Sequence, residues 1–468
     1  MGLAINNNVA SLNAQNNLTK TNNMLSSSLE KLSTGLKINR GADGPAALVI
    51  SEQQRAQIAG LRTAIDNTNK AVALVQTGEG ALDEMNKLLN KVRSLAVDSA
   101  NSGVNDANAQ AANQAEITNI LGTIDRIAGT TKFGTKNLFD GSAGVSGTTS
   151  DTDVTFLKGT VDSVAGSYAV NVTTAAQKAN VEAGTAQTTA LAADENLNVN
   201  GVQIKLTKGM TQSQVIDKVN EFTNQTGVKA DAGGTGGATR LVSTDYGSAA
   251  KITAISDVAG AADSSGISTT ALTDSGVDVV GDIGGLTTTG KGNVLTVTSG
   301  AAKGVSVSLG LAAGSGTTSV TGAQGNVNVV NNSLTFQVGA NSGETVKVSF
   351  DKLSTSSLGA GGSDLFANLG AITTANGGEA LKAIDKAIAD VTELRGRLGA
   401  FQSNTLESTA NNLRNTLENT TAAESVIRDT DFASEIANFT KFQTQMQAGS
   451  TVLGNANQIT QLVAGLLR

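Results

Sequence analysis

Large apolar residues recur every three or four positions over long stretches near both ends of the chain. This spacing places them on one narrow stripe of a helix, which is typical of helices that pair in a coiled coil. Similar runs over residues 61–99, 117–127 and 381–417 predict further helices. Near the beginning of the chain, the stripe consists of Leu18, Leu25, Leu29, Leu32 and Leu36.

The end of the chain repeats the pattern in two parts. Residues 442–467 contain no charged side chain but many Gln, Asn, Ser and Thr. Such polar side chains are costly in hydrocarbon, so we expect a helix within a protein environment and no membrane span. The first part of the stripe is Phe432, Ile436, Phe439, Met446 and Leu453, and the second part is Leu462, Val463, Leu466 and Leu467.

The middle of the chain has a different character. Most of the 53 glycines lie between residues 141 and 379, among many Thr, Ser and Val residues. Alternating apolar and polar positions around Asn200 and Gly201 predict two strands joined by a tight turn. We therefore predict an α+β fold: a long antiparallel helical coiled-coil or bundle core built from both chain ends, with β-rich outer domains inserted in the middle.

The first helical stretch is interrupted by the only proline of the chain. Gly41, Gly44 and Pro45 together break a helix, so we expect the first helix to end near Asn39 and the next to begin after Pro45. These three residues are the predicted hinge between a terminal and an inner helical segment.

The terminal segments have little apolar surface with which to fold alone. A single amphipathic helix is marginal in water. Burying a Leu-class side chain contributes about 1.5–3 kcal/mol, whereas ordering each residue costs about 1–2 kcal/mol. We predict that both ends are disordered in the monomer and fold only on assembly.

Composition excludes several classes of function. The 468 residues contain no Cys and no His, and 33 basic against 40 acidic residues give a net charge of −7. Without these side chains there is no thiol nucleophile, no disulfide and no His-based catalysis or zinc site. We therefore predict a non-enzyme without catalytic residues, metal or cofactor, and the acidic balance argues against nucleic acid as a partner. The first residues lack the pattern of a cleaved secretory signal.

Two motifs resemble chemical sites but have simpler explanations. Residues 285–291 fit the start of a phosphate-binding loop, but Gly292 stands where the magnesium-binding hydroxyl is needed, and a strand pattern follows. Asp429 and Asp431 open the last apolar stripe, as residues that cap a helix do.

Three stretches resemble the bacterial flagellins, the subunits of the flagellar filament. They are residues 5–48, which begin INNNVASLNAQ, residues 52–101, and residues 401–468. Residues 331–350 are similar to a hairpin of the family's inner helical domain, and 195–258 to a repeat module of flagellin outer domains. The resemblance implies a terminal coiled-coil domain (1–44 plus 426–468), an inner helical domain with a β-hairpin (45–141 plus 331–425), and outer β-rich domains at 142–262 and 263–330.

The resemblance also implies a function and partners. Flagellins are exported unfolded by the flagellar type III system and polymerise outside the cell into the filament used for motility. The expected partners are copies of the same chain, an export chaperone, the filament cap and hook-junction proteins, with no membrane partner. The paired ends line a central channel in such filaments, so we expect the uncharged residues 442–467 to line or support it.

Some flagellins are detected by a Toll-like receptor of the host through the helix that matches residues 89–98. Carried over by position, the contacts are Lys91, Arg93 and Leu95, with Glu116 on the adjacent helix. Lys91 stands where strongly activating members have Arg, and Lys does not reproduce a bidentate contact.

Two other functions remain as alternatives. A hook–filament junction protein would share these terminal helices but would stop at a short ring. A β-rich surface adhesin on a helical stalk belongs to another class and would normally need a secretory signal or an outer-membrane anchor.

Overall fold

The computed structural model describes residues 8–101, 105–312, 316–360, 368–374 and 377–466. The chain divides into two compact units. The first unit combines 1–69, 337–345 and 407–468, and the second combines 70–336 with 346–406. Each unit therefore joins segments from both halves of the chain.

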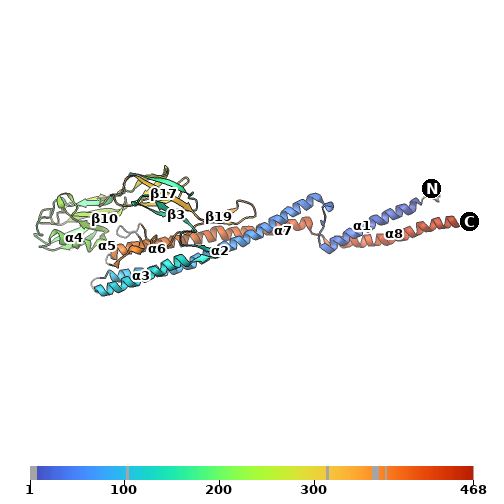
Figure 1. Cartoon of the computed structure of the whole chain (residues 1–468), viewed down its shortest axis with the longest axis horizontal. Helices are drawn as coiled ribbons and strands as arrows, with labels where there is room; N and C mark the ends of the chain where they lie inside the picture. The colour runs from blue at the N-terminus through green and yellow to red at the C-terminus, as the bar shows by residue number, and fades with distance from the viewer. Residues whose placement is uncertain (1–7, 102–104, 313–315, 361–367, 375–376, 467–468) are drawn as a thin grey trace. The chain divides into compact units, whose positions relative to one another are not determined.

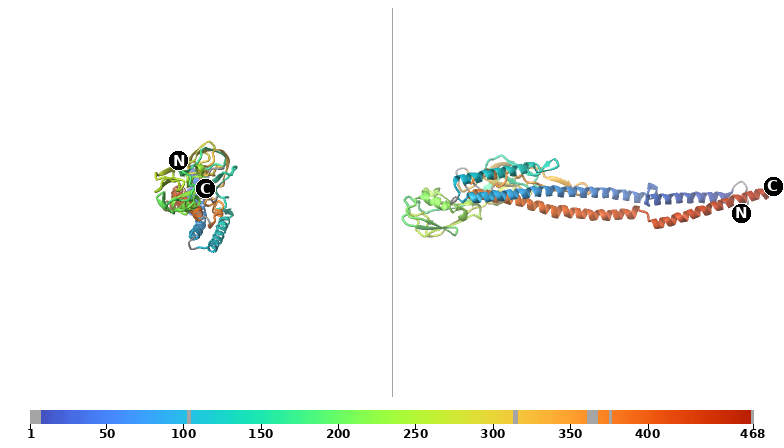
Figure 2. Two further views of the ribbon diagram at one scale, coloured as in Figure 1. Left: turned by 90° about the vertical axis from the view of Figure 1, so that its left-hand side faces the viewer. Right: turned by 90° about the horizontal axis from the view of Figure 1, so that it is seen from below.

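The first unit is helical. It contains α1 (Val9–Thr34), the beginning of α2 (Pro45–Ser99), α7 (Ser408–Arg428) and α8 (Phe432–Leu466). The helices α1 and α8 run side by side in opposite directions (Figures 1 and 2). At the start of α1, the Asn8 side chain accepts a hydrogen bond from the Ser11 N–H at 2.9 Å, which caps the helix.

The first helix ends earlier than predicted. It stops at Thr34, because Gly35 takes the left-handed conformation (φ 74°) and its N–H bonds to the Lys31 carbonyl. The predicted end near Asn39 is therefore wrong by several residues, and Leu36 lies outside the helix.

In the second unit the helices enclose one large apolar core. The rest of α2 packs with α3 (Ala107–Thr130) and α6 (Gly377–Ala400). Leu82, Met85 and Leu89 of α2 have no exposed surface. Phe139 and Phe350 meet edge to face in the same core, with ring centroids 5.7 Å apart.

A π-helix, Phe401–Glu407, connects α6 to α7. The buried positions around it, Leu398, Leu406 and Ala410, are spaced by eight and four residues. Steps of four drift away from one face of an α-helix, which has 3.6 residues per turn, whereas wider π turns accommodate the extra residue. The π-helix therefore keeps Leu406 in the core.

Eight of the strands form one sheet in the second unit, in the order β3-β17-β5-β13-β14-β15-β16-β4. All its pairs are antiparallel. Its strands are β3 (Val145–Thr149), β4 (Val154–Lys158), β5 (Gly166–Thr174), β13 (Val280–Ile283), β14 (Leu286–Lys291), β15 (Val294–Val297), β16 (Ser306–Leu309) and β17 (Gly322–Asn331).

A second β-rich body, which we call the 178–275 module, is inserted between β5 and β13. It has its own apolar core, covered by the short helices α4 (Gln212–Asn220) and α5 (Thr223–Thr226). One sheet contains β6 (Lys178–Glu182), β10 (Arg240–Tyr246) and β9 (Val228–Asp231). The other contains β12 (Leu272–Ser275), β11 (Lys251–Ser256), β7 (Glu195–Val199) and β8 (Val202–Leu206).

This strand pairing divides the middle of the chain differently from the expected outer domains at 142–262 and 263–330. Strands on both sides of the 178–275 module share the large sheet, so the module is nested inside the other β-rich body. The sequence does not indicate this nesting, because it depends on pairing between strands that are far apart in the chain.

The remaining strands form two small hairpins, β1 (Lys132–Phe133) with β2 (Lys136–Asn137), and β18 (Leu334–Gln337) with β19 (Thr345–Val348). The turn predicted at Asn200 and Gly201 is confirmed, with positive φ values of 51° and 87° between β7 and β8. Helical ends around a β-rich middle confirm the predicted α+β class.

Candidate assembly surface

The α1–α8 pair is held in a definite antiparallel register by polar contacts at its two ends. The Asn8 amide donates to the Ala456 carbonyl at 3.0 Å, and the Ser11 hydroxyl donates to Asn457 Oδ1 at 2.8 Å. Near the other end, the Ser28 hydroxyl lies 3.5 Å from the Glu435 carbonyl oxygen. From the contacts at Asn8 and Ser11 to the contact at Ser28, the partner on α8 moves back from Asn457 to Glu435, as an antiparallel pair requires.

The side chains that pack between the two helices follow a seven-residue repeat. We call this packed interface the seam. On α1, Leu18, Leu25 and Leu32 alternate with smaller residues, and on α8 the large residues are Phe439, Met446 and Leu453. All six are half-buried. A Cβ added to Gly449 would lie 3.3 Å from Leu18 Cδ1, so the glycine leaves room for this leucine.

A second set of large apolar side chains on the same two helices stays exposed. Leu29 is 56% exposed and Ile436 is 53% exposed. Because Ser28 lies beside Glu435, the next residues, Leu29 and Ile436, are within one helical turn of each other along the pair. Phe432 is 52% exposed and lies next to Gly35. We call Leu29, Phe432 and Ile436 the open patch.

The structure thus separates the predicted packing residues into two groups, those of the seam and those of the open patch. Leu36 belongs to neither, because it lies in the connection after α1, half-buried. Leu462, Val463 and Leu466 lie within α8, and Leu467 is outside the described residues.

The predicted hinge is part of an ordered connection between α1 and α2, residues 35–44, which contacts residues 428–430. We call this connection the joint. Leu36 pairs with Asp429 as a short antiparallel bridge, flanked by bonds from the Lys37 N–H to the Arg428 carbonyl (2.7 Å) and from the Thr430 N–H to the Gly35 carbonyl (2.9 Å). Gly41 opens a 3₁₀ turn that ends at Asp43, and after Gly44 the helix α2 begins at Pro45.

Charged side chains reinforce this joint. Asp43 accepts hydrogen bonds from the backbone N–H groups of Arg40 and Asn39, which lower its pKa. Arg428, whose side chain is 14% exposed, donates to Glu52 at 2.8 Å, and this bond, followed by that from Arg55, lowers the pKa of Glu52. Arg428 is not predicted from the sequence, where its only signal is a cation directly before Asp429, the residue that caps α7.

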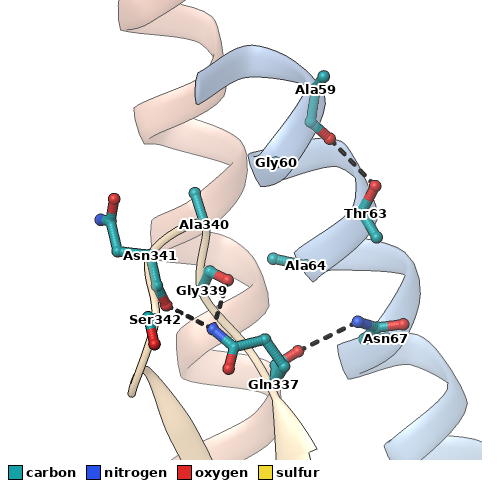
Figure 3. A pocket seen from close by; sticks show the side chains of 10 residues that line it. All are labelled: Ala59, Gly60, Thr63, Ala64, Asn67, Gln337, Gly339, Ala340, Asn341 and Ser342. Atoms are coloured by element: carbon teal, nitrogen blue, oxygen red, sulfur yellow. Dashed lines mark hydrogen bonds between the residues drawn. The ribbon is translucent and has the colours of Figure 1, made fainter. Parts of the chain in front are cut away.

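The tip of the β18–β19 hairpin lies against α2 in the first unit (Figure 3). Gly60 permits this approach, because a Cβ there would stand 3.0 Å from Ala340 Cβ. The Asn67 amide donates to the Gln337 carbonyl at 3.3 Å, and a shallow groove of about 440 Å³ remains between the tip and the helix. The groove is small and open, and nothing in its lining suggests chemistry.

The four residues carried over as receptor contacts lie in the second unit. Lys91 pairs with Glu116 at 2.6 Å, and Arg93 pairs with Asp385 of α6 at 2.6 Å, which raises the pKa of Arg93. Leu95 is half-buried against the helical core. Both cations are thus already engaged with carboxylates of the same chain.

Within the described part of the chain, no group of acidic side chains is arranged to hold a metal ion. None of the described helices is long and apolar enough to cross a bilayer.

Comparison with protein families identifies both helical ends. The model of the bacterial flagellin N-terminal helical region matches residues 5–144. The model of the C-terminal helical region matches residues 381–467. These two matches cover the helices that build the α1–α8 pair and the helical core.

Full-length relatives extend the likeness to the whole chain. The chain is 34% identical to the B-type flagellin of Pseudomonas aeruginosa over 511 aligned positions, covering 100% of both proteins. It is also 34% identical to a flagellin of Salmonella typhimurium and 31% identical to one of Clostridium tyrobutyricum, covering at least 98% of each protein.

Solved structures give a weaker likeness. A flagellar hook-associated protein of Legionella pneumophila aligns with 80% of this chain and 97% of its own, at 14% identity and a TM-score of 0.32. FliC from Burkholderia pseudomallei aligns with 71% of this chain and 98% of its own, at 18% identity and a TM-score of 0.26.

Two family models at the helical ends and full-length relatives above 30% identity agree with the paired helices and the β-rich middle. The chain belongs to the bacterial flagellin family and is a structural subunit of the extracellular flagellar filament.

Proposed function

We propose that this subunit polymerises because other copies cover the apolar side chains that the α1–α8 pair leaves exposed. The observation that carries the proposal is the open patch: Leu29, Phe432 and Ile436 are each more than half exposed on helices whose seam is already occupied. A filament subunit always meets further copies of itself, so the same pair of helices on a neighbour is the nearest cover.

The energy of this contact is sufficient to matter. Full burial of a Leu-class side chain contributes about 1.5–3 kcal/mol, so half-exposed Leu29 and Ile436 together contribute about 1.5–3 kcal/mol when covered. The seam offers less to a single chain, since only Ser28 and Ala456 are buried among the described side chains of α1 and α8. Assembly therefore supplies burial that one chain lacks.

The same weakness suits the route that the family resemblance implies. A terminal pair with so few buried side chains costs little to open, which supports export of this chain unfolded and capture of its ends by an export chaperone. We extend the proposal to the filament cap and hook-junction proteins as partners at the filament ends, and to the joint of Gly41, Gly44 and Pro45 as the hinge between terminal and inner helices.

For detection by a host receptor, we propose that Lys91, Arg93, Leu95 and Glu116 form a contact weaker than in strongly activating flagellins. The ion pairs with Glu116 and Asp385 support this, because a receptor must displace or share them. A reporter-cell assay with purified monomer tests it, and an undiminished response would contradict it.

The assembly proposal is tested with the full-length chain. Replacing both Leu29→Gln and Ile436→Gln keeps good helix formers but removes the apolar cover. From the energy above, the critical concentration for polymerisation, measured by sedimentation, should rise by about 10- to 150-fold.

A matched control changes polar residues one heptad away. Asn22 and Gln443, both exposed, occupy the equivalent positions, so Asn22→Gln with Gln443→Asn should leave the critical concentration unchanged. Equal critical concentrations for the double Gln variant and the original chain would show that the open patch is not an assembly contact.

A further inference from the structure

The 178–275 module meets the first turns of α6 through a chain of four alternating charges. Lys229 Nζ of β9 lies 3.7 Å from Glu379 Oε1, and Glu379 Oε1 lies 3.7 Å from Lys382 Nζ of the same helix. Lys382 Nζ lies 3.6 Å from Asp245 Oδ1 of β10. Two of these three contacts join the module to the helix, and the four charges sum to zero.

The contact is tight at its centre and open at its edges. The Glu379 side chain is 9% exposed, whereas that of Asp245 is 77% exposed and that of Lys229 is 51% exposed. Beside them the backbone of Gly378 in α6 comes close to the Asn224 side chain of α5. A Cβ on Gly378 would stand 1.9 Å from Asn224 Oδ1. The buried carboxylate therefore depends on cations, one of which the module supplies.

The other β-rich body contacts the same helix in a different way. Lys158 of β4 donates directly to Glu393 of α6 at 2.7 Å, and this bond, against the effect of burial, holds the pKa of Glu393 below its usual value. The two N–O distances at Glu379, both 3.7 Å, are about 1 Å longer than in a hydrogen-bonded ion pair. Contacts at this distance are mainly Coulombic, and salt reaches them from the side of Lys229 and Asp245, whose side chains are more than half exposed.

We propose that Lys229, Glu379, Lys382 and Asp245 form a salt-sensitive clasp that holds the 178–275 module against α6. At low ionic strength the clasp keeps the module closed on the helix. At high ionic strength screening weakens the two contacts that join the module to α6, and the module is released from the helix while its bonds to the other β-rich body, such as that between Ser248 and Asp278, remain. In the filament, ionic strength thereby sets how firmly this outer module is held.

The absence of cysteine from the chain permits a direct test with two spin labels. Exposed Ser213 on α4 and Ala389 on α6 are replaced as Ser213→Cys and Ala389→Cys in the full-length monomer, and the distance between labels is measured by pulsed electron resonance. At 0.1 M salt, where charges act over about 10 Å, the proposal predicts one narrow distance distribution. At 1 M salt, where the range is about 3 Å, the population at longer distances should rise about three- to tenfold.

Variants separate the clasp from general effects of salt. Lys229→Gln with Lys382→Gln should give the broad distribution already at 0.1 M salt, and Lys382→Arg alone should keep the narrow one. Lys218→Gln is the matched control, because Lys218 pairs with Glu221 inside the module, at 2.6 Å, and should change nothing. The proposal would be overturned if the distance distribution changed neither with salt in the protein with an unaltered clasp nor in the Lys229→Gln, Lys382→Gln variant. This outcome does not depend on the polymerisation experiments.

Discussion

The α1–α8 pair and the helical core of the second unit use the same spacing of apolar residues but bury them to very different degrees. In the core, Leu82, Met85 and Leu89 of α2 have no exposed surface. In the pair, Leu18, Leu25 and Leu32 occupy equivalent positions and are only half-buried. Periodicity therefore identifies which residues face a partner, but not how completely the partner covers them.

The difference follows from the number of elements that surround each stripe. In the second unit, α2 packs against α3, α6 and the segments around Phe139 and Phe350, so every side of the stripe has a neighbour. Among the described residues, the stripe on α1 packs mainly against α8. A pair of helices can cover a seam but not the flanks of the seam, which is where Leu29 and Ile436 lie. We propose that further copies supply the missing layer.

The largest expected effect of a single substitution lies in the core. Leu89→Ala removes a fully buried side chain and leaves a cavity, which should lower the free energy of unfolding by about 2–5 kcal/mol. Urea denaturation of the monomer, followed by circular dichroism, measures it. A loss below 1 kcal/mol would mean that this core is no better packed than the terminal pair.

The hairpin tip gives an intermediate effect in the first unit. Gly60→Val places a branched side chain where even a Cβ would stand 3.0 Å from Ala340, so the tip must move. Overpacking of this kind typically costs about 1–3 kcal/mol. The same denaturation experiment measures it, with Gly80→Val as control, because a Cβ there meets nothing within 4 Å. Val is a better helix former than Gly, so the control should not be destabilised by propensity, and equal changes in both variants would show that the contact with Ala340 does not matter.

The seam should show a small effect in the monomer and a larger one in the filament. Leu25→Ala removes a half-buried side chain, so we expect at most about 1 kcal/mol in monomer unfolding. Filament disassembly on heating should shift clearly to lower temperature, because other copies complete the burial. An effect as large as that of Leu89→Ala in the monomer would contradict the comparison.

The smallest effect concerns two carboxylates, one in each unit. The pKa of Asp278 is lowered by the Ser248 hydroxyl and the Gly292 N–H, and that of Asp43 by the N–H groups of Arg40 and Asn39. A lowered pKa in the folded state gives stability that is present above the unfolded value of 3.8 and is lost as the pH falls through the folded value. NMR titration should find Asp278 below 3.8 in the monomer.

For Asp43 the outcome separates the two regions. If the joint is folded in the monomer, Asp43 also titrates below 3.8, whereas a joint that forms only in the filament leaves it near the unfolded value. Asp43→Asn should remove the pH dependence at the joint without altering Asp278.

Local patterns in the sequence predicted the helical stripes, the strands around Asn200 and the break at Pro45. Three features were not predictable in the same way. The helix α1 ends at Thr34, where Gly35 takes the left-handed conformation, and Leu36 then pairs with Asp429, a residue almost four hundred positions away. The π-helix follows from a small excess in spacing around Leu406, which is evident only once burial is known. The nested 178–275 module depends on strand pairing across its whole length.

The candidate surface was likewise predicted in part. The sequence selected Leu29, Phe432 and Ile436 together with Leu18, Leu25 and Leu32 as one group, because all share the helical spacing. Their division into seam and open patch depends on the register set by Asn8 with Ala456 and Ser28 with Glu435. These contacts join polar groups at no recognisable sequence spacing.

The central claim is that the terminal helices are completed only by other copies of the chain. Hydrogen exchange of the full-length protein, followed peptide by peptide in monomer and filament, tests it most directly. We predict that amides of residues 9–34 and 432–458 exchange rapidly in the monomer and become strongly protected in the filament, while those of residues 82–96 are protected in both. Strong protection of both terminal helices already in the isolated monomer would contradict the claim.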